Sequence, residues 1–75
     1  MARKGYTLGE YDMVVDNGDG TAVAIFEIDD EDVKAAANLL GLELIEAHRF
    51  APGFDDPDEL VGHVDEFEDI TVHVA

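Results

Sequence analysis

Residues 11–28, YDMVVDNGDGTAVAIFEI, decide the fold. Apolar side chains recur at every second position from Tyr11 to Val15, which is the period of a β-strand. Residues 17–20, NGDG, are dense in residue types that tolerate positive φ and suit a tight turn. Residues 21–28 are rich in β-strand formers and apolar on both faces over most of their length, as in a central strand. The segment therefore predicts a β-hairpin.

The chain before this hairpin carries a weaker strand pattern. Residues 1–5 are expected to form a flexible tail. Tyr6 and Leu8 have the opposite parity to the hairpin's first strand. Gly9 therefore marks a bulge or a break where the phase slips.

A helix is predicted directly after the hairpin. Its apolar stripe has spacings of three and four residues and consists of Val33, Ala36, Ala37 and Leu40. Either Asp29 or Asp30 is expected to cap the start, and the neighbouring acids suit the positive end of the helix dipole. Gly41 fits the position that ends a helix.

Residues 42–50, LELIEAHRF, fit two structures. Leu44 and Ala47 would continue the helical stripe past Gly41. A strand is preferred, because Gly41 is a natural stop and the segment would complete a β–α–β unit.

A second helix and a last strand are predicted in the C-terminal third. Asp56, Pro57 and Glu59 suit the N-cap, first and third positions of a helix. The buried stripe of this helix would be Leu60, Val61, Val64 and Phe67. The last strand would follow from the alternation of Ile70, Val72 and Val74. The expected fold is one small α+β domain spanning residues 1–75, in β-β-α-β-α-β order, with a mixed sheet of about four strands and two helices on one face.

The composition excludes several classes of protein. The chain has 75 residues, 4 Lys plus Arg and 19 Asp plus Glu, hence a net charge of −15, and no cysteine. The lack of cysteine excludes disulfides, thiol nucleophiles and Cys-type metal sites. No apolar run approaches the ~20 residues of a membrane span, and Arg3 and Lys4 are not followed by a signal-peptide core. We expect a cytoplasmic protein.

The charge is large for so small a chain. A radius of gyration of about 11 Å corresponds to a sphere roughly 29 Å across. Duplex DNA carries as many charges over about 25 Å of its axis. A surface this negative repels nucleic acid and anionic membranes, so the expected partners are basic protein surfaces, such as those of nucleic-acid-binding proteins or complexes.

The acids concentrate in three runs, residues 27–32, 55–59 and 65–69, which lie near expected helix starts and in adjoining segments. Helix caps account for part of them but not for the shortage of Lys and Arg. In length, acidity and lack of cysteine the chain resembles small phage-encoded inhibitors, among them anti-CRISPR and anti-restriction DNA mimics. This resemblance implies a non-enzymatic protein that blocks a basic nucleic-acid-binding surface, in the host cytoplasm if phage-encoded. The expected contacts are Glu27, Asp29, Asp30, Glu31, Asp32, Asp55, Asp56, Asp58, Glu59, Asp65, Glu66, Glu68 and Asp69.

A second hypothesis explains the acidity as salt adaptation. In a halophilic organism, a small structural, assembly or housekeeping domain would carry acids on every face, because concentrated salt screens their repulsion. Acids outside the three runs favour this hypothesis; they are Glu10, Asp12, Asp16, Asp19, Glu43 and Glu46.

Metal sites and cofactors are not expected. Residues 16–20, DNGDG, resemble part of a calcium loop, but Val15 and Phe26 would occupy essential ligand positions. The flanking segments are strands, so a hairpin turn is the better interpretation. The chain has three histidines, His48, His63 and His73. They are expected on separate elements and do not have a zinc-ligand spacing.

Catalysis is not expected either. Glu27 and Glu46 lie in strand-like segments, where partial burial would suit a general acid. No nucleophile–base pair or phosphate-binding loop accompanies them, and a domain this small has little room for a deep pocket.

A homodimer is an alternative assembly. The hairpin and the last strand can leave a sheet edge unpaired. Val14, Val23 and Ile25 suggest surplus apolar surface on the hairpin's second face, which a second copy or another part of the chain would cover.

Overall fold

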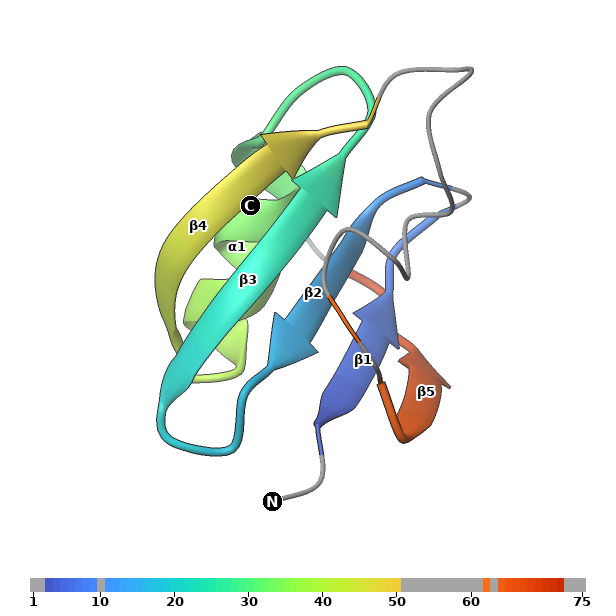
Figure 1. Ribbon diagram of the computed structural model, residues 1–75. Helices are drawn as coiled ribbons and strands as arrows, with labels where there is room; N and C mark the ends of the chain where they lie inside the picture. Colours follow the sequence, from blue (N-terminus) through green and yellow to red (C-terminus); the bar gives the residue numbers. More distant parts are fainter. Residues whose placement is uncertain (1–2, 10, 51–61, 63, 73–75) are drawn as a thin grey trace.

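One mixed sheet and one helix make up the part of the chain that the computed structural model describes, residues 3–9, 11–50, 62 and 64–72 (Figure 1). The strands are β1 (Lys4–Thr7), β2 (Met13–Asp16), β3 (Thr21–Phe26), β4 (Glu43–Arg49) and β5 (Glu66–Asp69), and the helix is α1 (Glu31–Leu39). The sheet has five strands in the order β4-β3-β2-β1-β5. β2 is antiparallel to its neighbours β1 and β3, whereas β4 and β5 pair in parallel with β3 and β1.

The predicted α+β class and mixed sheet are confirmed, but the inventory of elements differs. The described residues form five strands instead of about four, and one helix instead of two. Within these residues, no helix has the length and hydrophobicity that a membrane crossing needs.

The predicted hairpin is confirmed as β2 and β3. Asp16 and Asp19 shape its turn, since their carboxylates accept the N–H groups of Gly18 and Thr21 at 2.8 and 3.0 Å. Gly18 and Gly20 have φ of 87° and 91°, a region that favours glycine. The expected break near Gly9 is a tight turn between β1 and β2.

Helix α1 begins and ends near the predicted residues. Asp30 occupies the N-cap position, yet it is the Asp29 carboxylate that accepts the N–H of Glu31, at 3.0 Å. At the C-terminal end, Gly41 has φ of 72°, and its N–H and that of Leu42 reach back to carbonyls of the last turn. This is the Schellman arrangement, and it explains why the helix stops.

The preferred strand in residues 42–50 is confirmed as β4. It runs parallel to β3, and α1 forms the crossover between them. The register shifts within β4. Thr21 and Val23 of β3 pair with Glu43 and Glu46, so an advance of two residues along β3 corresponds to an advance of three along β4. This is a β-bulge.

The predicted second helix is wrong where the structure describes it. Glu66 and Phe67 belong to β5, which pairs with β1. The Phe67 ring lies over Gly5, where an added Cβ would be 2.8 Å from a ring carbon. Two nonlocal contacts attach this segment to β1. Gly5 leaves room for the Phe67 ring, and Lys4 forms an ion pair with Glu68. The expected helix start, with Leu60 and Val61, lies outside the described residues.

The predicted last strand is also displaced. The strand ends at Asp69, before Ile70 and Val72, which were expected to form it. Ile70 still donates its N–H to Thr7 at 2.9 Å, and Val72 packs against the core on the α1 side. Val74 lies outside the described residues.

The expected tail over residues 1–5 is wrong at residues 3–5, and residues 1–2 lie outside the described residues. Lys4 and Gly5 belong to β1, because β5 and β2 pair with them on both sides. Arg3 is also held, since its guanidinium donates to the Asn17 side chain at 3.0 Å.

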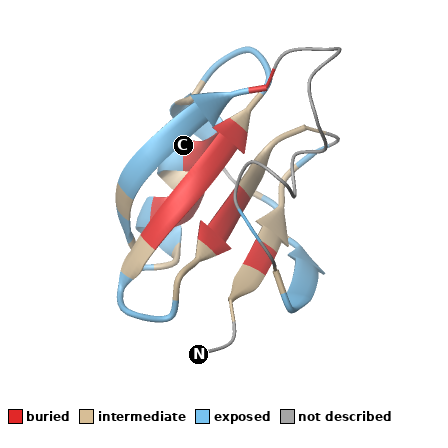
Figure 2. Ribbon diagram, viewed as in Figure 1, coloured by how far each residue is buried: buried red, intermediate tan, exposed pale blue. Residues whose placement is uncertain are grey.

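The buried residues concentrate on β2, β3 and α1 (Figure 2), and they form one cluster on each face of the sheet. On one face, α1 packs against β2, β3 and β4. This cluster contains Val14, Ala22, Ala24, Val33, Ala36 and Ala37. On the other face, Phe50 closes over a smaller cluster of Val15, Val23 and Ile25, with Tyr11 stacked on Phe50 at 4.7 Å between ring centroids.

The expectation that Val14, Val23 and Ile25 share the second face of the hairpin is wrong for one of these residues. Val14 lies under α1, not on the second face. Val23 and Ile25 do lie on the second face, and they are buried there in a cluster with Val15 and Phe50 of the same chain.

Candidate acidic interface

The first acidic run, residues 27–32, connects β3 to α1. Its backbone is held in place: the Glu27 N–H donates to the Asp12 carboxylate at 2.8 Å, and Arg49 Nε donates to the Glu27 carbonyl at 3.2 Å. The side chains of this run are exposed apart from half-buried Asp30. Glu31 and Asp32 stand in the first turn of α1, where the helix dipole favours negative charge.

The third run, residues 65–69, forms the edge strand β5 and the residue before it. The Asp65 N–H donates to the Arg3 carbonyl at 3.0 Å, and the four residues of β5 are exposed. Lys4 pairs with Glu68 at 2.6 Å, and this hydrogen bond raises the pKa of the lysine. The second run, with Asp55, Asp56, Asp58 and Glu59, lies outside the described residues.

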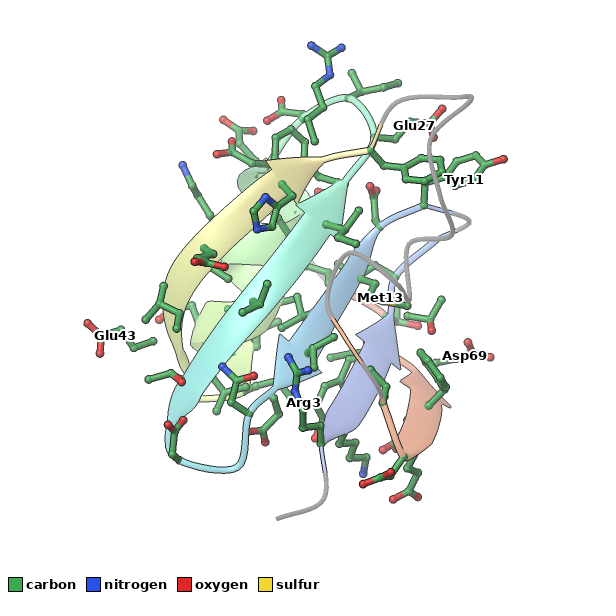
Figure 3. The ribbon with its side chains drawn as sticks, viewed as in Figure 1. Arg3, Tyr11, Met13, Glu27, Glu43 and Asp69 are labelled. Atoms are coloured by element: carbon green, nitrogen blue, oxygen red, sulfur yellow. The ribbon has the colours of Figure 1, made fainter. Side chains whose placement is uncertain are left out.

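The first and third runs lie apart in the sheet. Strands β2 and β1 separate β3 from β5, which at about 4.8 Å per strand places them roughly 14 Å apart. Asp12 and Asp32 line a hollow of about 240 Å³ together with Leu8 and residues 70–72, which follow β5. Figure 3 shows Glu27, Glu43 and Asp69 at three separate places around the sheet.

All the basic side chains are engaged within the molecule. The chain has 4 Lys plus Arg. Lys4 pairs with Glu68, and Lys34 pairs with Asp30 at 2.8 Å, which raises the pKa of Lys34 through the hydrogen bond. Arg3 and Arg49 donate to uncharged oxygens, as given above. Most described carboxylates therefore have no cation beside them, and the acidic surplus remains at the surface.

The turn between β2 and β3 supports the hairpin interpretation over a calcium loop. The carboxylates of Asp16 and Asp19 accept hydrogen bonds from backbone N–H groups of the turn, and Asp19 also accepts one from the Thr21 hydroxyl. These hydrogen bonds, that of the hydroxyl first, lower the pKa of Asp19. Among the described residues, no group of three or more His, Asp or Glu is placed to hold a metal ion.

The catalytic candidates are not buried as a general acid would require. Glu27 and Glu46 are both exposed, because one follows the end of β3 and the other lies on the edge strand β4. His48 is exposed beside Glu46, 3.3 Å from its carboxylate. His63 and His73 lie outside the described residues.

Sequence reasoning missed the grouping of Glu43 and Glu46. Simple alternation places residues three apart on opposite faces of a strand. The bulge in β4 instead sets Glu43 beside Thr21 and Glu46 beside Val23, which share the face away from α1. No residue pattern in this segment indicates the bulge.

No protein-family model, curated protein or solved structure matches this chain.

Proposed function

We propose that this chain is a non-enzymatic binding protein that mimics nucleic acid and blocks the basic nucleic-acid-binding surface of a partner. One observation carries the proposal: exposed carboxylates in the first and third acidic runs have no Lys or Arg paired with them. They belong to Glu27, Asp29, Glu31, Asp32, Asp65, Glu66 and Asp69.

The arrangement supports binding to a basic groove for two reasons. Lys4 and Lys34 are paired with carboxylates, so only the charges of Arg3 and Arg49 are left without an acidic partner to oppose a positive surface. The radius of gyration is 11.1 Å, and over so small a body a charge of −15 approaches the linear charge density of duplex DNA. Arginine and lysine side chains that bind phosphates form charge-assisted hydrogen bonds with carboxylates as well.

Competition with DNA tests the proposal. Basic, sequence-nonspecific DNA-binding proteins are loaded with fluorescent duplex DNA, and release of the duplex is followed by anisotropy as this protein is added. We expect release that weakens steeply as salt rises from about 0.05 to 0.2 M. Polyglutamate of matched charge is the control. No release, or equal release by polyglutamate, contradicts the proposal.

Charge-neutral variants locate the contacts. Glu31→Gln with Asp32→Asn alters the first run, and Glu66→Gln with Asp69→Asn alters the third. Each pair removes two exposed charges, so we expect each to weaken competition roughly fivefold. If both variants compete as well as the parent protein, these runs do not form the interface.

A second candidate function is a structural, assembly or housekeeping domain of a halophilic organism. The distribution of acids favours it, because they occupy both edges of the sheet and both of its ends: Glu43 on β4, Asp69 on β5, Glu27 after β3 and Asp19 in the opposite turn. In concentrated salt such a surface needs no partner.

A further inference from the structure

Strand β4 is an open edge of the sheet. It is the longest of the described strands, Glu43–Arg49, and stands at one end of the strand order. Within the described residues, no strand pairs with its outer side. An exposed edge presents N–H and C=O groups that accept a further strand.

The hydrogen bonds to β3 show which backbone groups face outward. Glu43 donates its N–H to Gly20 at 2.9 Å, and Phe50 donates to Phe26 at 2.7 Å, so both N–H groups point toward β3. Because successive residues of a strand point to opposite sides, the backbone groups of Ala47 and Arg49 point away from β3.

The bulge gives this edge a charged face. Glu43 and Glu46 lie on the side away from α1, opposite Thr21 and Val23 of β3. Their positions are about 7 Å apart along the strand, which is the spacing of alternate residues in an added strand. No Lys or Arg of the chain pairs with either carboxylate. The edge also exposes 55% of Ile45, an apolar side chain.

Charge decides which strand this edge accepts. A second copy brings another −15, and antiparallel pairing of β4 with itself about its central residue sets two Glu46 side chains against each other. A strand with Lys or Arg at alternate positions instead sets a cation opposite each carboxylate. We propose that β4 binds an extended, Lys- or Arg-rich segment of a partner protein as a sixth strand of the sheet. This inference rests on the proposed function and adds a binding mode to it.

A short capped peptide of alternating lysine and valine tests the inference by NMR at about 0.15 M salt. We expect binding to shift the amide signals of β4 and to slow hydrogen exchange at Ala47 and Arg49. The same peptide with every backbone nitrogen methylated keeps its charge and loses its N–H donors. It should bind about tenfold more weakly, because a few hydrogen bonds are lost.

Two variants with equal charge change locate the site. Glu43→Gln with Glu46→Gln should weaken peptide binding about fivefold. Asp12→Asn with Asp16→Asn removes the same charge away from β4 and keeps the two Oδ1 acceptors that hold Glu27 and Gly18, so it should leave the affinity within about twofold. Circular dichroism checks that each variant remains folded.

The other outcomes each overturn the inference in a distinguishable way. Equal binding of the methylated peptide rejects strand addition and leaves the acidic surface as a site for basic partners. Failure of the peptide to bind, together with failure to release DNA in the competition assay, rejects the proposed function as well. Protection of Ala47 and Arg49 without peptide, with a dimer in sedimentation equilibrium, assigns the edge to a second copy.

Discussion

Gly5→Ala is expected to destabilise the protein, because the Phe67 ring occupies the space that a side chain at Gly5 needs. An ideal Cβ at this position would be 2.8 and 2.9 Å from two carbons of the Phe67 ring and 3.0 Å from a methyl carbon of Val64. Carbon atoms in contact are about 3.5–4.0 Å apart, so the ring and the methyl group must each retreat by roughly 0.5–1 Å.

The magnitude follows from the burial of Phe67. Its ring is 49% exposed, so swinging it fully into water would uncover about half of a phenylalanine. Half of roughly 200 Å², at about 25 cal/mol per Å², sets an upper limit of about 2.5 kcal/mol. Replacing glycine in a strand regains about 0.5–1 kcal/mol. We therefore expect a net loss of at most about 1.5–2 kcal/mol, or at most roughly 10 °C in Tm for a domain of this size.

Thermal and denaturant unfolding measure this loss, with Gly9→Ala as the matched control. The nearest atom to an added Cβ at Gly9 is an Asp12 carboxylate oxygen 4.0 Å away, so that variant should change stability by less than about 0.5 kcal/mol. In a Phe67→Ala background the ring contacts are absent and only the Val64 contact remains, so Gly5→Ala should destabilise less than in the parent chain. Equal or greater stability of Gly5→Ala in the parent chain would refute the packing of β5 on β1.

Three further substitutions test the core, the helix end and the hairpin turn. Ile25→Ala empties a fully buried position and should cost about 3 kcal/mol in denaturant unfolding; a loss below about 1 kcal/mol would contradict its burial. Gly41 has φ of 72° and open space around it, so Gly41→Ala should lower the free energy of unfolding by about 1 kcal/mol through backbone strain alone. Gly41→Asn should lower it less, and equal effects of the two variants in thermal melts would argue against the Schellman end. Thr21→Val removes the hydroxyl that lowers the pKa of Asp19, so that pKa should rise toward 3.8 in an NMR titration. A carboxylate whose pKa is lowered by folding stabilises the fold at a pH above its pKa in the unfolded chain. The contribution of Asp19 should therefore be lost as pH falls below about 3.8. An unchanged Asp19 pKa in the variant would exclude the hydrogen bond as the cause.

Local signals were enough to predict the hairpin, α1 and β4. Alternation, turn residues and the Gly41 stop act within a few neighbouring residues, and the structure follows them. β5 depends instead on contacts across the chain: a glycine that receives Phe67 and a lysine that pairs with Glu68. The segment EFED holds one apolar residue and carries no strand period of its own, so its neighbours on β1 decide its conformation.

The candidate site shows the same division. The composition of the first and third acidic runs favours exposure, and their residues are exposed wherever the structure describes them, except half-buried Asp30. Their placement does not follow from the sequence, because the sheet order puts two strands between them. The shared face of Glu43 and Glu46 depends on a single bulge in β4, which only the pairing with β3 reveals.

We propose that the surplus carboxylates form a binding surface on a domain that folds without concentrated salt. Circular dichroism melts at about 0.15 M and at multi-molar KCl test it most directly, because screening differs several-fold between these conditions. We expect a folded protein with a cooperative transition at the lower concentration. A chain that is unfolded there and folds only at multi-molar KCl would contradict the claim and assign its acidity to salt adaptation.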